Sequence, residues 1–481
     1  IRRCVGATDD HAVIFAGSGS TAAIAKLVGV LGIAIPSPLE DRYRLSEEIP
    51  PTERPVVFIG PFEHHSNELP WRESIADVVT IDEDRDGRID LEHLERELVE
   101  HRDRPLKIGS FSAASNVTGI VSDAVAISRL LHRHGALALW DYAAAAPYVR
   151  IAMNPPDDGD PDLEAAKDAV FISPHKFIGG PGTPGVLVVK RHLLTNRVPT
   201  VPGGGTVSYV SAEGHSYVSE PTVREEGGTP AIIESIRAGL VFHLKAAVGE
   251  DTIEALEASF IERAIGSWSS NSRIEILGNR TAPRLSIVSF LIRHGDRFLH
   301  HNFVVALLND LFGIQTRGGC SCAGPYGHRL LRIDGTTSSR FRAAIHAGCE
   351  GIKPGWVRIG FNYFISERVF EFLLDAVHMV ADHGWKLLPE YHFEPTSGVW
   401  RHRETPEGAR RSLLDVNYRS GSMDSRDDSL IEPESALPGY LEQVRDLVER
   451  SAVNAQADRP RDRLADDLEA LRWFPLSGDT A

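Results

Sequence analysis

A serine, a histidine and a lysine stand almost side by side at Ser173, His175 and Lys176, directly after an apolar strand that ends at Ile172. A loop rich in glycine and proline follows, and a second apolar run begins at Val186. This pattern predicts a turn between two buried strands, in which the amine of Lys176 is partly desolvated. Burial favours the neutral amine, which can form a Schiff base. The alternative interpretation is an ordinary surface lysine in a turn.

Two further charged residues occur in apolar surroundings. Asp141 follows the apolar run 136–140, and Arg358 lies within the run 355–362. An arginine there is costly unless it is paired, and a substrate carboxylate would be a natural bidentate partner. A structural salt bridge is the alternative for Arg358, and an aspartate that merely caps a turn is the alternative for Asp141.

A glycine-rich turn at 17–21 opens a predicted helix with Ser20 and Thr21 at its start. Helix N-termini offer unpaired N–H groups and the positive end of the helix dipole, which suits a phosphate. A turn that only caps the helix would look the same.

The cysteines Cys320 and Cys322 lie in a Gly/Ser-rich loop just after Arg317. A thiolate in a flexible loop beside a cation is suited to nucleophilic attack. Two alternatives remain open: the pair could bind a metal together with Cys349, or the cysteines could be incidental to the chemistry.

Strands and helices must alternate to position these residues. Strands are expected near 11–15, 56–59, 108–112 and 136–140, with a helix at 122–134, which predicts a mostly parallel sheet covered by helices on both faces. Ligands bind such sheets at the carboxyl ends of the strands, where Asn116, Asp141 and Lys176 fall.

The second half of the chain has a different pattern, and three regions are expected. A smaller α+β unit should contain helices 251–269, 301–312 and 366–381 and strands 273–277 and 285–292. The domains are therefore predicted at 1–245, 246–390 and, as a polar, partly helical extension, 391–481. Within the extension we expect a linker at 420–428 and short helices near 438–451 and 462–472.

Composition narrows the class of protein. A chain of 481 residues with net charge −16 does not suit nucleic acid or an anionic membrane surface as a partner. No apolar run is long enough to span a membrane, and we expect no signal peptide. Four cysteines are too few for a disulfide scaffold, so a cytoplasmic location is expected. The acidic run 82–90 resembles a calcium loop, but His93 stands where a glutamate is needed, which favours a capped helix.

Three motifs resemble one family. Ser-x-His-Lys at 173–176, Glu-His-His-x-Asn-x-x-Pro-Trp at 63–71 and Gly-Thr-Pro at 228–230 look like those of the class V aminotransferases, which use pyridoxal phosphate (PLP), and particularly of the cysteine desulfurase and selenocysteine lyase branch. The resemblance covers about 13–380. It implies the PLP fold type I, a large α/β domain with a smaller α+β domain, in a homodimer with shared active sites. It also implies a small amino-acid substrate and a sulfur-acceptor protein.

The resemblance also implies roles for individual residues. Lys176 would carry the cofactor, His64 would stack on its ring, Asp141 would face the pyridine nitrogen and Asn116 the ring hydroxyl. The cofactor-binding set it implies is Ser20, Thr21, His64, Asn116, Asp141, Ser173, His175, Lys176 and, across a dimer interface, Thr229. Cys322, five residues after Arg317, would take sulfur from L-cysteine and leave alanine, with Lys176 and His64 as the other catalytic residues. Arg358 and Arg317 would bind the substrate.

Two departures from the family keep other functions open. Desulfurases usually have a glutamine three residues after the aspartate, where this chain has Ala144. An aminotransferase, epimerase or carbon–sulfur lyase that uses no cysteine nucleophile is therefore the alternative. The chain also begins at Ile1, whereas family members carry an upstream segment that helps to line the active site. Without it, a catalytically silent fold or assembly partner is the third hypothesis.

Overall fold

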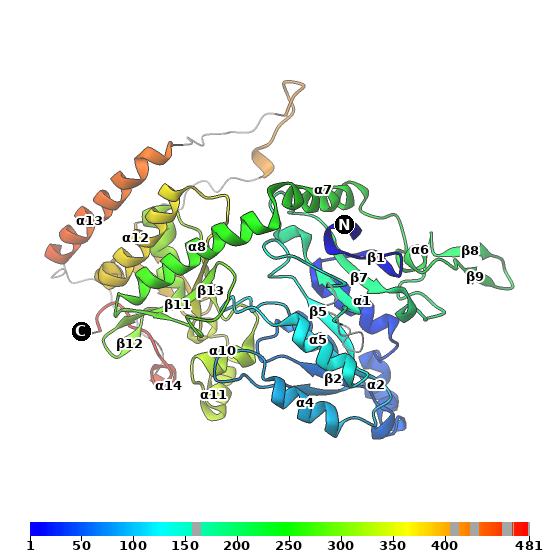
Figure 1. Ribbon diagram of the computed structural model, residues 1–481. Helices are drawn as coiled ribbons and strands as arrows, with labels where there is room; N and C mark the ends of the chain where they lie inside the picture. Colours follow the sequence, from blue (N-terminus) through cyan, green and yellow to red (C-terminus); the bar gives the residue numbers. More distant parts are fainter. Residues whose placement is uncertain (156–164, 405–412, 424–431, 455–463, 465, 480–481) are drawn as a thin grey trace. The chain divides into compact units, whose positions relative to one another are not determined.

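The computed structural model describes residues 1–155, 165–404, 413–423, 432–454, 464 and 466–479 (Figure 1). The chain divides into two compact units. Unit 1 comprises residues 1–261, 278–288 and 321–330, and unit 2 comprises residues 262–277, 289–320 and 331–481.

Unit 1 contains a seven-stranded sheet in the order β1-β7-β6-β5-β4-β2-β3. Strands β3, β2, β4, β5 and β6 are mutually parallel, and β7 runs antiparallel to both β6 and β1. Six of its strands therefore share one direction, which confirms the predicted mostly parallel sheet. The strands are β1 (His11–Ala16), β2 (Val56–Ile59), β3 (Asp77–Thr80), β4 (Lys107–Ser112), β5 (Leu137–Asp141), β6 (Ala169–Ile172) and β7 (Gly185–Lys190).

Helices cover both faces of this sheet. Helix α1 (Gly19–Val30) buries Ile24 and Leu27 in one core cluster with Leu139 of β5. The next residue of β5, Trp140, donates its indole N–H to Ser128 of α5 (Ala124–Arg133) at 3.0 Å. Since successive residues of a strand face opposite sides, α1 and α5 lie on opposite faces.

The other elements of unit 1 connect this sheet or extend from it. A two-stranded hairpin, β8 (Val207–Val210) and β9 (His215–Tyr217), projects from the unit in Figure 1. Asp90 caps α4 through the N–H groups of Glu92 and His93, as the sequence predicted. The remaining helices are α2 (Ser37–Tyr43), α3 (Leu69–Arg72), α4 (Leu91–Glu100), α6 (Pro221–Glu225), α7 (Ile232–Val248), α10 (Gly324–Leu330) and the larger part of α8 (Glu250–Ser269).

Unit 2 is an α+β unit around a sheet in the order β10-β11-β14-β13, with β12 paired to β11. Its strands are β10 (Ile274–Ile276), β11 (Ile287–His294), β12 (Arg297–Phe298), β13 (Arg317–Gly319) and β14 (Trp356–Gly360), together with the hairpin β15 (Tyr391–Glu394) and β16 (Val399–His402). Its helices are α9 (His301–Phe312), α11 (Gly335–His346), α12 (Glu367–His383), α13 (Leu437–Asn454) and α14 (Asp466–Glu469).

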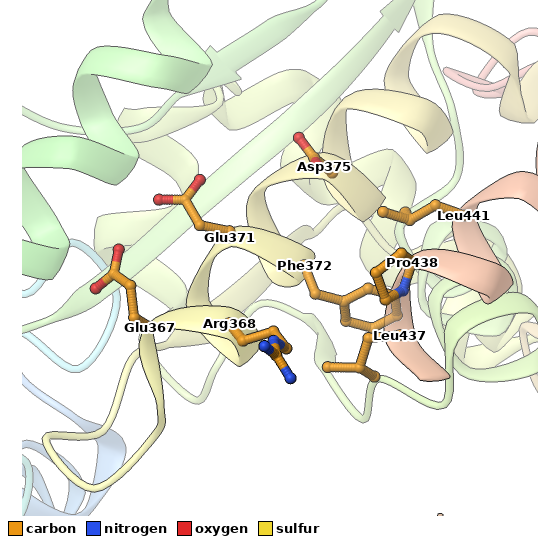
Figure 2. A pocket seen from close by; sticks show the side chains of 8 residues that line it. All are labelled: Glu367, Arg368, Glu371, Phe372, Asp375, Leu437, Pro438 and Leu441. Atoms are coloured by element: carbon orange, nitrogen blue, oxygen red, sulfur yellow. The ribbon is translucent and has the colours of Figure 1, made fainter. Parts of the chain in front are cut away.

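The described part of the C-terminal region belongs to unit 2 and packs on it. In Figure 2, Phe372 of α12 points towards Leu437 and Pro438 of α13. The helix predicted near 438–451 is therefore present as α13. Within the region predicted as helix 462–472, α14 is only four residues long, and residues 462, 463 and 465 lie outside the described part. So does 424–428 of the predicted linker.

The last described segment closes an aromatic cluster in unit 2. The ring of Trp473 stacks on His300 (centroids 5.3 Å apart) and on His301 (5.7 Å), and its N–H donates to the carbonyl of Ile352 at 3.0 Å. Phe474 is fully buried against Phe393, 5.2 Å between centroids.

Candidate active site

The predicted cofactor residues of unit 1, apart from Thr229, gather at one edge of the seven-stranded sheet. They follow β1, β2, β4, β5 and β6, which all run in the same direction and so end at this edge. The residues in question are Ser20, Thr21, His64, Asn116, Asp141, Ser173, His175 and Lys176. This is the edge at which a parallel sheet offers its binding crevice.

The turn with Lys176 packs directly on the N-terminus of α1. Ser173 accepts a hydrogen bond on Oγ from the N–H of Ser20 at 2.9 Å. Gly19 has φ +59, and a Cβ there would lie 2.7 Å from the ring of His175 and 2.9 Å from Ser173 Oγ. Only glycine fits both the conformation and the space. The N-terminus of α1 and the turn that carries Lys176 therefore form one continuous surface.

Lys176 itself is exposed in the isolated chain, so the expected desolvation of its amine is not seen. It lies at the end of the short helix Pro174–Lys176, whose other polar residue, His175, is also exposed. Partial burial, with Lys176 next to it, lowers the pKa of His175. The apolar strands on either side are buried as predicted, but the turn opens to the outside because it lies beyond their ends.

Asp141 is a buried carboxyl at the end of β5. One oxygen accepts the N–H of Ala143 at 2.8 Å. Burial raises its pKa, against the opposing effects of the Ala143 N–H, the positive charge of Lys176 and a hydrogen bond from Ser20. A buried carboxyl of this kind gains from a cationic partner, as a protonated ring nitrogen would be.

His64 is held by a chain of polar contacts from α1. Its Nδ1 accepts the N–H of Ser66 at 3.1 Å and lies 3.0 Å from Ser66 Oγ, which is 2.6 Å from Thr21 Oγ1. Since Nδ1 accepts, the proton of the neutral ring is on Nε2. The imidazole is thus fixed in orientation and tautomer at the same edge.

Glu63 is a site residue to which the sequence patterns assigned no role. Its carboxylate is fully buried and accepts from the N–H groups of Gly60 (3.2 Å) and Ser112 (2.9 Å), from Ser112 Oγ (2.6 Å) and from Asn67 Nδ2 (2.7 Å). Burial raises its pKa to about 7, although these donors oppose the shift. It ties the loop that carries His64 to β4. A glutamate in the apolar stretch 56–63 was the available signal.

Hydrogen bonds hold residues 321–324, the part of the cysteine loop that belongs to unit 1, whereas the sequence predicted a flexible loop. Asn116 donates through Nδ2 to the carbonyl of Ser321 at 2.7 Å. The carbonyl of Cys322 accepts the N–H of His65 at 2.9 Å, and the N–H of Gly324 donates to His65 Nε2 at 3.0 Å. The amide that we expected to serve a ring hydroxyl is thus engaged by the cysteine loop.

Unit 2 brings together the two predicted substrate arginines. Arg317 of β13 lies directly opposite Arg358 of β14 in an antiparallel pair. Directly opposed residues share a face of the sheet, and like charges there destabilise it. Cys320 follows β13 in the same unit and is partly exposed, and Thr229 of unit 1 is exposed just before α7.

The described residues lack two further features. Across the described ranges, no group of three or more His, Cys, Asp or Glu residues is placed to hold a metal ion. Among the helices that the structure describes, none has both the length and the apolar character needed to cross a membrane.

Comparisons with known proteins agree on one family. Residues 44–361 match the family model for aminotransferase class V. A probable cysteine desulfurase of Halalkalibacterium halodurans is 29% identical over 344 residues, which are 71% of this chain and 75% of that protein. One from Streptomyces coelicolor is 30% identical over 308 residues, 63% of this chain and 67% of that protein.

Solved structures share the fold. The apo structure of cysteine desulfurase from Thermococcus onnurineus aligns with a TM-score of 0.61 at 22% identity, covering 79% of this chain and 82% of that one. The cysteine desulfurase CsdA from Escherichia coli gives a TM-score of 0.58 at 21% identity, with the same coverage. The predicted fold, PLP fold type I, is thereby confirmed.

Proposed function

The chain belongs to the aminotransferase class V family, and we propose that it is a PLP enzyme that removes sulfur from L-cysteine and releases alanine. The observation that carries this proposal is the Cys322 loop, which unit 1 holds in place through His65 and Asn116. His64 and the strand that leads to Asn116 belong to the same edge as Lys176 and Asp141. A lyase or aminotransferase without a thiol step would have no use for a cysteine fixed there.

The residues at the sheet edge fit the cofactor. The turn that carries Lys176 packs on the start of α1 at Gly19, and the N-cap residue Ser18 makes no side-chain cap hydrogen bond. Ser20 and Thr21 would hold the phosphate there. Asp141 would face the ring nitrogen, His64 the ring face, and Lys176 would bind covalently. When bound, PLP supplies an electron sink for negative charge at the substrate Cα.

The chain's own residues would then do the following. Arg358 and Arg317 bind the substrate carboxylate. Lys176, assisted by His64, moves the Cα proton. The Cys322 thiolate attacks the substrate sulfur, so that a sulfur–sulfur bond forms and the carbon–sulfur bond breaks. The carbon keeps the electron pair, takes up a proton and leaves as alanine, and the enzyme holds a persulfide. Atoms and electrons balance without an external oxidant.

The thiol step can be tested by comparing two single variants. With PLP and L-cysteine, we expect wild type and Cys320→Ser to release alanine and to carry one added sulfur on Cys322 by mass spectrometry. Cys322→Ala should fall to the rate of cofactor without protein, because no thiolate accepts the sulfur. Unchanged alanine release by Cys322→Ala would favour the alternative, an aminotransferase, epimerase or carbon–sulfur lyase, which Ala144 supports.

We also infer that the partner of α7 is a second copy of the chain. Five large apolar side chains are exposed along this helix: Ile232, Ile233, Ile236, Leu240 and Leu244. A contiguous apolar face of this kind is typical of a protein–protein interface. Thr229, just before the helix, would then reach the phosphate site of the partner.

The homodimer predicts a clear result. Ile236→Asp combined with Leu240→Asp should convert the protein from dimer to monomer in light scattering at micromolar concentration, because two charges would be buried in the interface. Leu39→Asp, which alters an exposed leucine of α2, is the control and should stay dimeric. A wild-type monomer would contradict the inference.

A sulfur-acceptor protein and a cytoplasmic location complete the proposal. Sulfur bound to Cys322 must leave for turnover to continue, and Cys322 is partly exposed. No two of the four cysteines, all of which the structure describes, form a disulfide, as suits a reducing compartment.

A further inference from the structure

His65 is a residue for which the proposed chemistry has no role, yet it contacts the cysteine loop twice. Its backbone N–H donates to the carbonyl of Cys322 at 2.9 Å. Its ring Nε2 accepts the N–H of Gly324 at 3.0 Å. One residue therefore holds the loop at the candidate nucleophile and two positions after it.

Asn116 holds the same loop on the other side. Its side-chain amide donates to the carbonyl of Ser321 at 2.7 Å, and Ser321 is only 2% exposed. Together, three hydrogen bonds fix the backbone of 321–324 to the ends of two loops at the sheet edge. All these residues lie in unit 1.

The loop needs this support because its backbone is strained. Ser321 and Cys322 have φ +54 and +56, in the left-handed region that residues other than glycine rarely adopt. Such conformations persist only where the surroundings hold them, and they cluster at functional sites. Without its hydrogen bonds, this turn would relax towards right-handed geometry and re-aim the thiol.

We propose that His65 and Asn116 are positioning residues for the Cys322 thiol, holding it in a left-handed turn from which it captures sulfur. The inference rests on the proposed desulfurase function. Both residues act through the loop backbone, and since His65 has no place in the cofactor-binding set, its loss should slow sulfur capture and leave the binding of L-cysteine nearly unchanged. The two neighbouring histidines then have different roles: His64 would stack on the cofactor ring, and His65 would hold the loop that carries Cys322.

The loop can be tested without cofactor, in the full chain with Cys320→Ser as background. Hydrogen exchange at the Gly324 amide should become about five- to tenfold faster in His65→Ala, because a hydrogen bond of ordinary strength is lost. His65→Gln, whose carbonyl can still accept, should restore protection. Asn116→Asp keeps the shape but cannot donate, and it should change the rate at which iodoacetamide alkylates Cys322 as much as Asn116→Ala does.

Far-UV circular dichroism establishes that each variant is folded, and the Gln and Asp variants remain informative if an alanine variant is not. Equal exchange and alkylation rates in wild type and all folded variants would overturn the inference.

Steady-state kinetics of the PLP-loaded enzyme supply the second readout. We expect His65→Ala to lower kcat for alanine at least about fivefold, in line with the lost hydrogen bond, while KM changes less than about twofold. A rise in KM with kcat unchanged would contradict a role in positioning the thiol. If wild type makes no alanine, the proposed function fails, whereas the exchange and alkylation data still decide whether His65 and Asn116 hold the loop.

Discussion

Lys176→Ala should lower the rate of alanine formation from L-cysteine by about 10²–10⁴-fold, the usual loss when a positioned proton-transfer group is removed. The turn that carries Lys176 packs on the N-terminus of α1. Burial raises the pKa of the Asp141 carboxyl, and the positive charge of Lys176 opposes this rise. Its amine would serve as both covalent anchor and base, so one substitution removes both roles. The variant should still fold, because Lys176 is exposed in the isolated chain.

The measurement is alanine release, with borohydride reduction and peptide mass spectrometry as a second readout. Wild type should carry the reduced cofactor on the peptide that contains Lys176, and the variant should not. Lys353→Ala, which alters an exposed lysine of unit 2, is the matched control and should retain wild-type activity. Cofactor trapped on another lysine in wild type would contradict the assignment.

Acidification should destabilise unit 2 through His300 and His301. Burial holds the pKa of His301 down to about 3, with a smaller effect from Lys353, and burial also lowers the pKa of His300. In the unfolded chain both would titrate near 6.5. Between pH 6.5 and 3 the unfolded state therefore binds more protons than the folded state, so the free energy of unfolding falls as pH falls.

For His301 alone, lowering the pH from 6.5 to 4.5 should cost about 2 kcal/mol: the slope approaches roughly 1.4 kcal/mol for each pH unit, but it is only about half as steep at pH 6.5, where the unfolded histidine is half protonated. Urea unfolding followed by tryptophan fluorescence at both pH values measures the change. His301→Gln should be less stable at pH 7 and should lose this part of the pH dependence.

The pH dependence of the free energy of unfolding should be compared between wild type and His301→Gln, because Glu63 changes this free energy in the opposite direction. Its raised pKa, about 7, makes the contribution of this carboxyl grow as pH falls towards 4.5. The matched control is His392→Gln, at an exposed position, which should keep the wild-type pH dependence. If His301→Gln keeps it too, the buried histidine is not its source.

The sheet and its ligand edge could be predicted because the signals are local. Short apolar runs such as 56–59 define buried strands, and the parallel rule then places the residues that follow β2, β4, β5 and β6 at one edge. The helices α8, α9 and α12 likewise begin and end within about two residues of their expected bounds, since their apolar periodicity is regular.

What could not be predicted depends on contacts between residues far apart in the chain. Asn116 and Ser321 are 205 residues apart, and His65 and Gly324 are 259 apart, so no pattern of nearby residues indicates that the cysteine loop is held. The Gly/Ser-rich composition predicted a flexible loop, but these hydrogen bonds hold the loop in place. Lys176 was expected to be desolvated because its neighbours are apolar, yet exposure depends on where the turn ends relative to the sheet.

The aromatic cluster under Trp473 and Phe474 has a practical consequence for handling this protein. A recombinant version shortened before residue 472 would uncover His300, His301 and Phe393 to water together. Such a version would expose an apolar surface and should precipitate at a lower temperature than the full chain. The aromatic pair Trp473 and Phe474 therefore helps to keep unit 2 in solution by covering these side chains, and an affinity tag belongs at the other end.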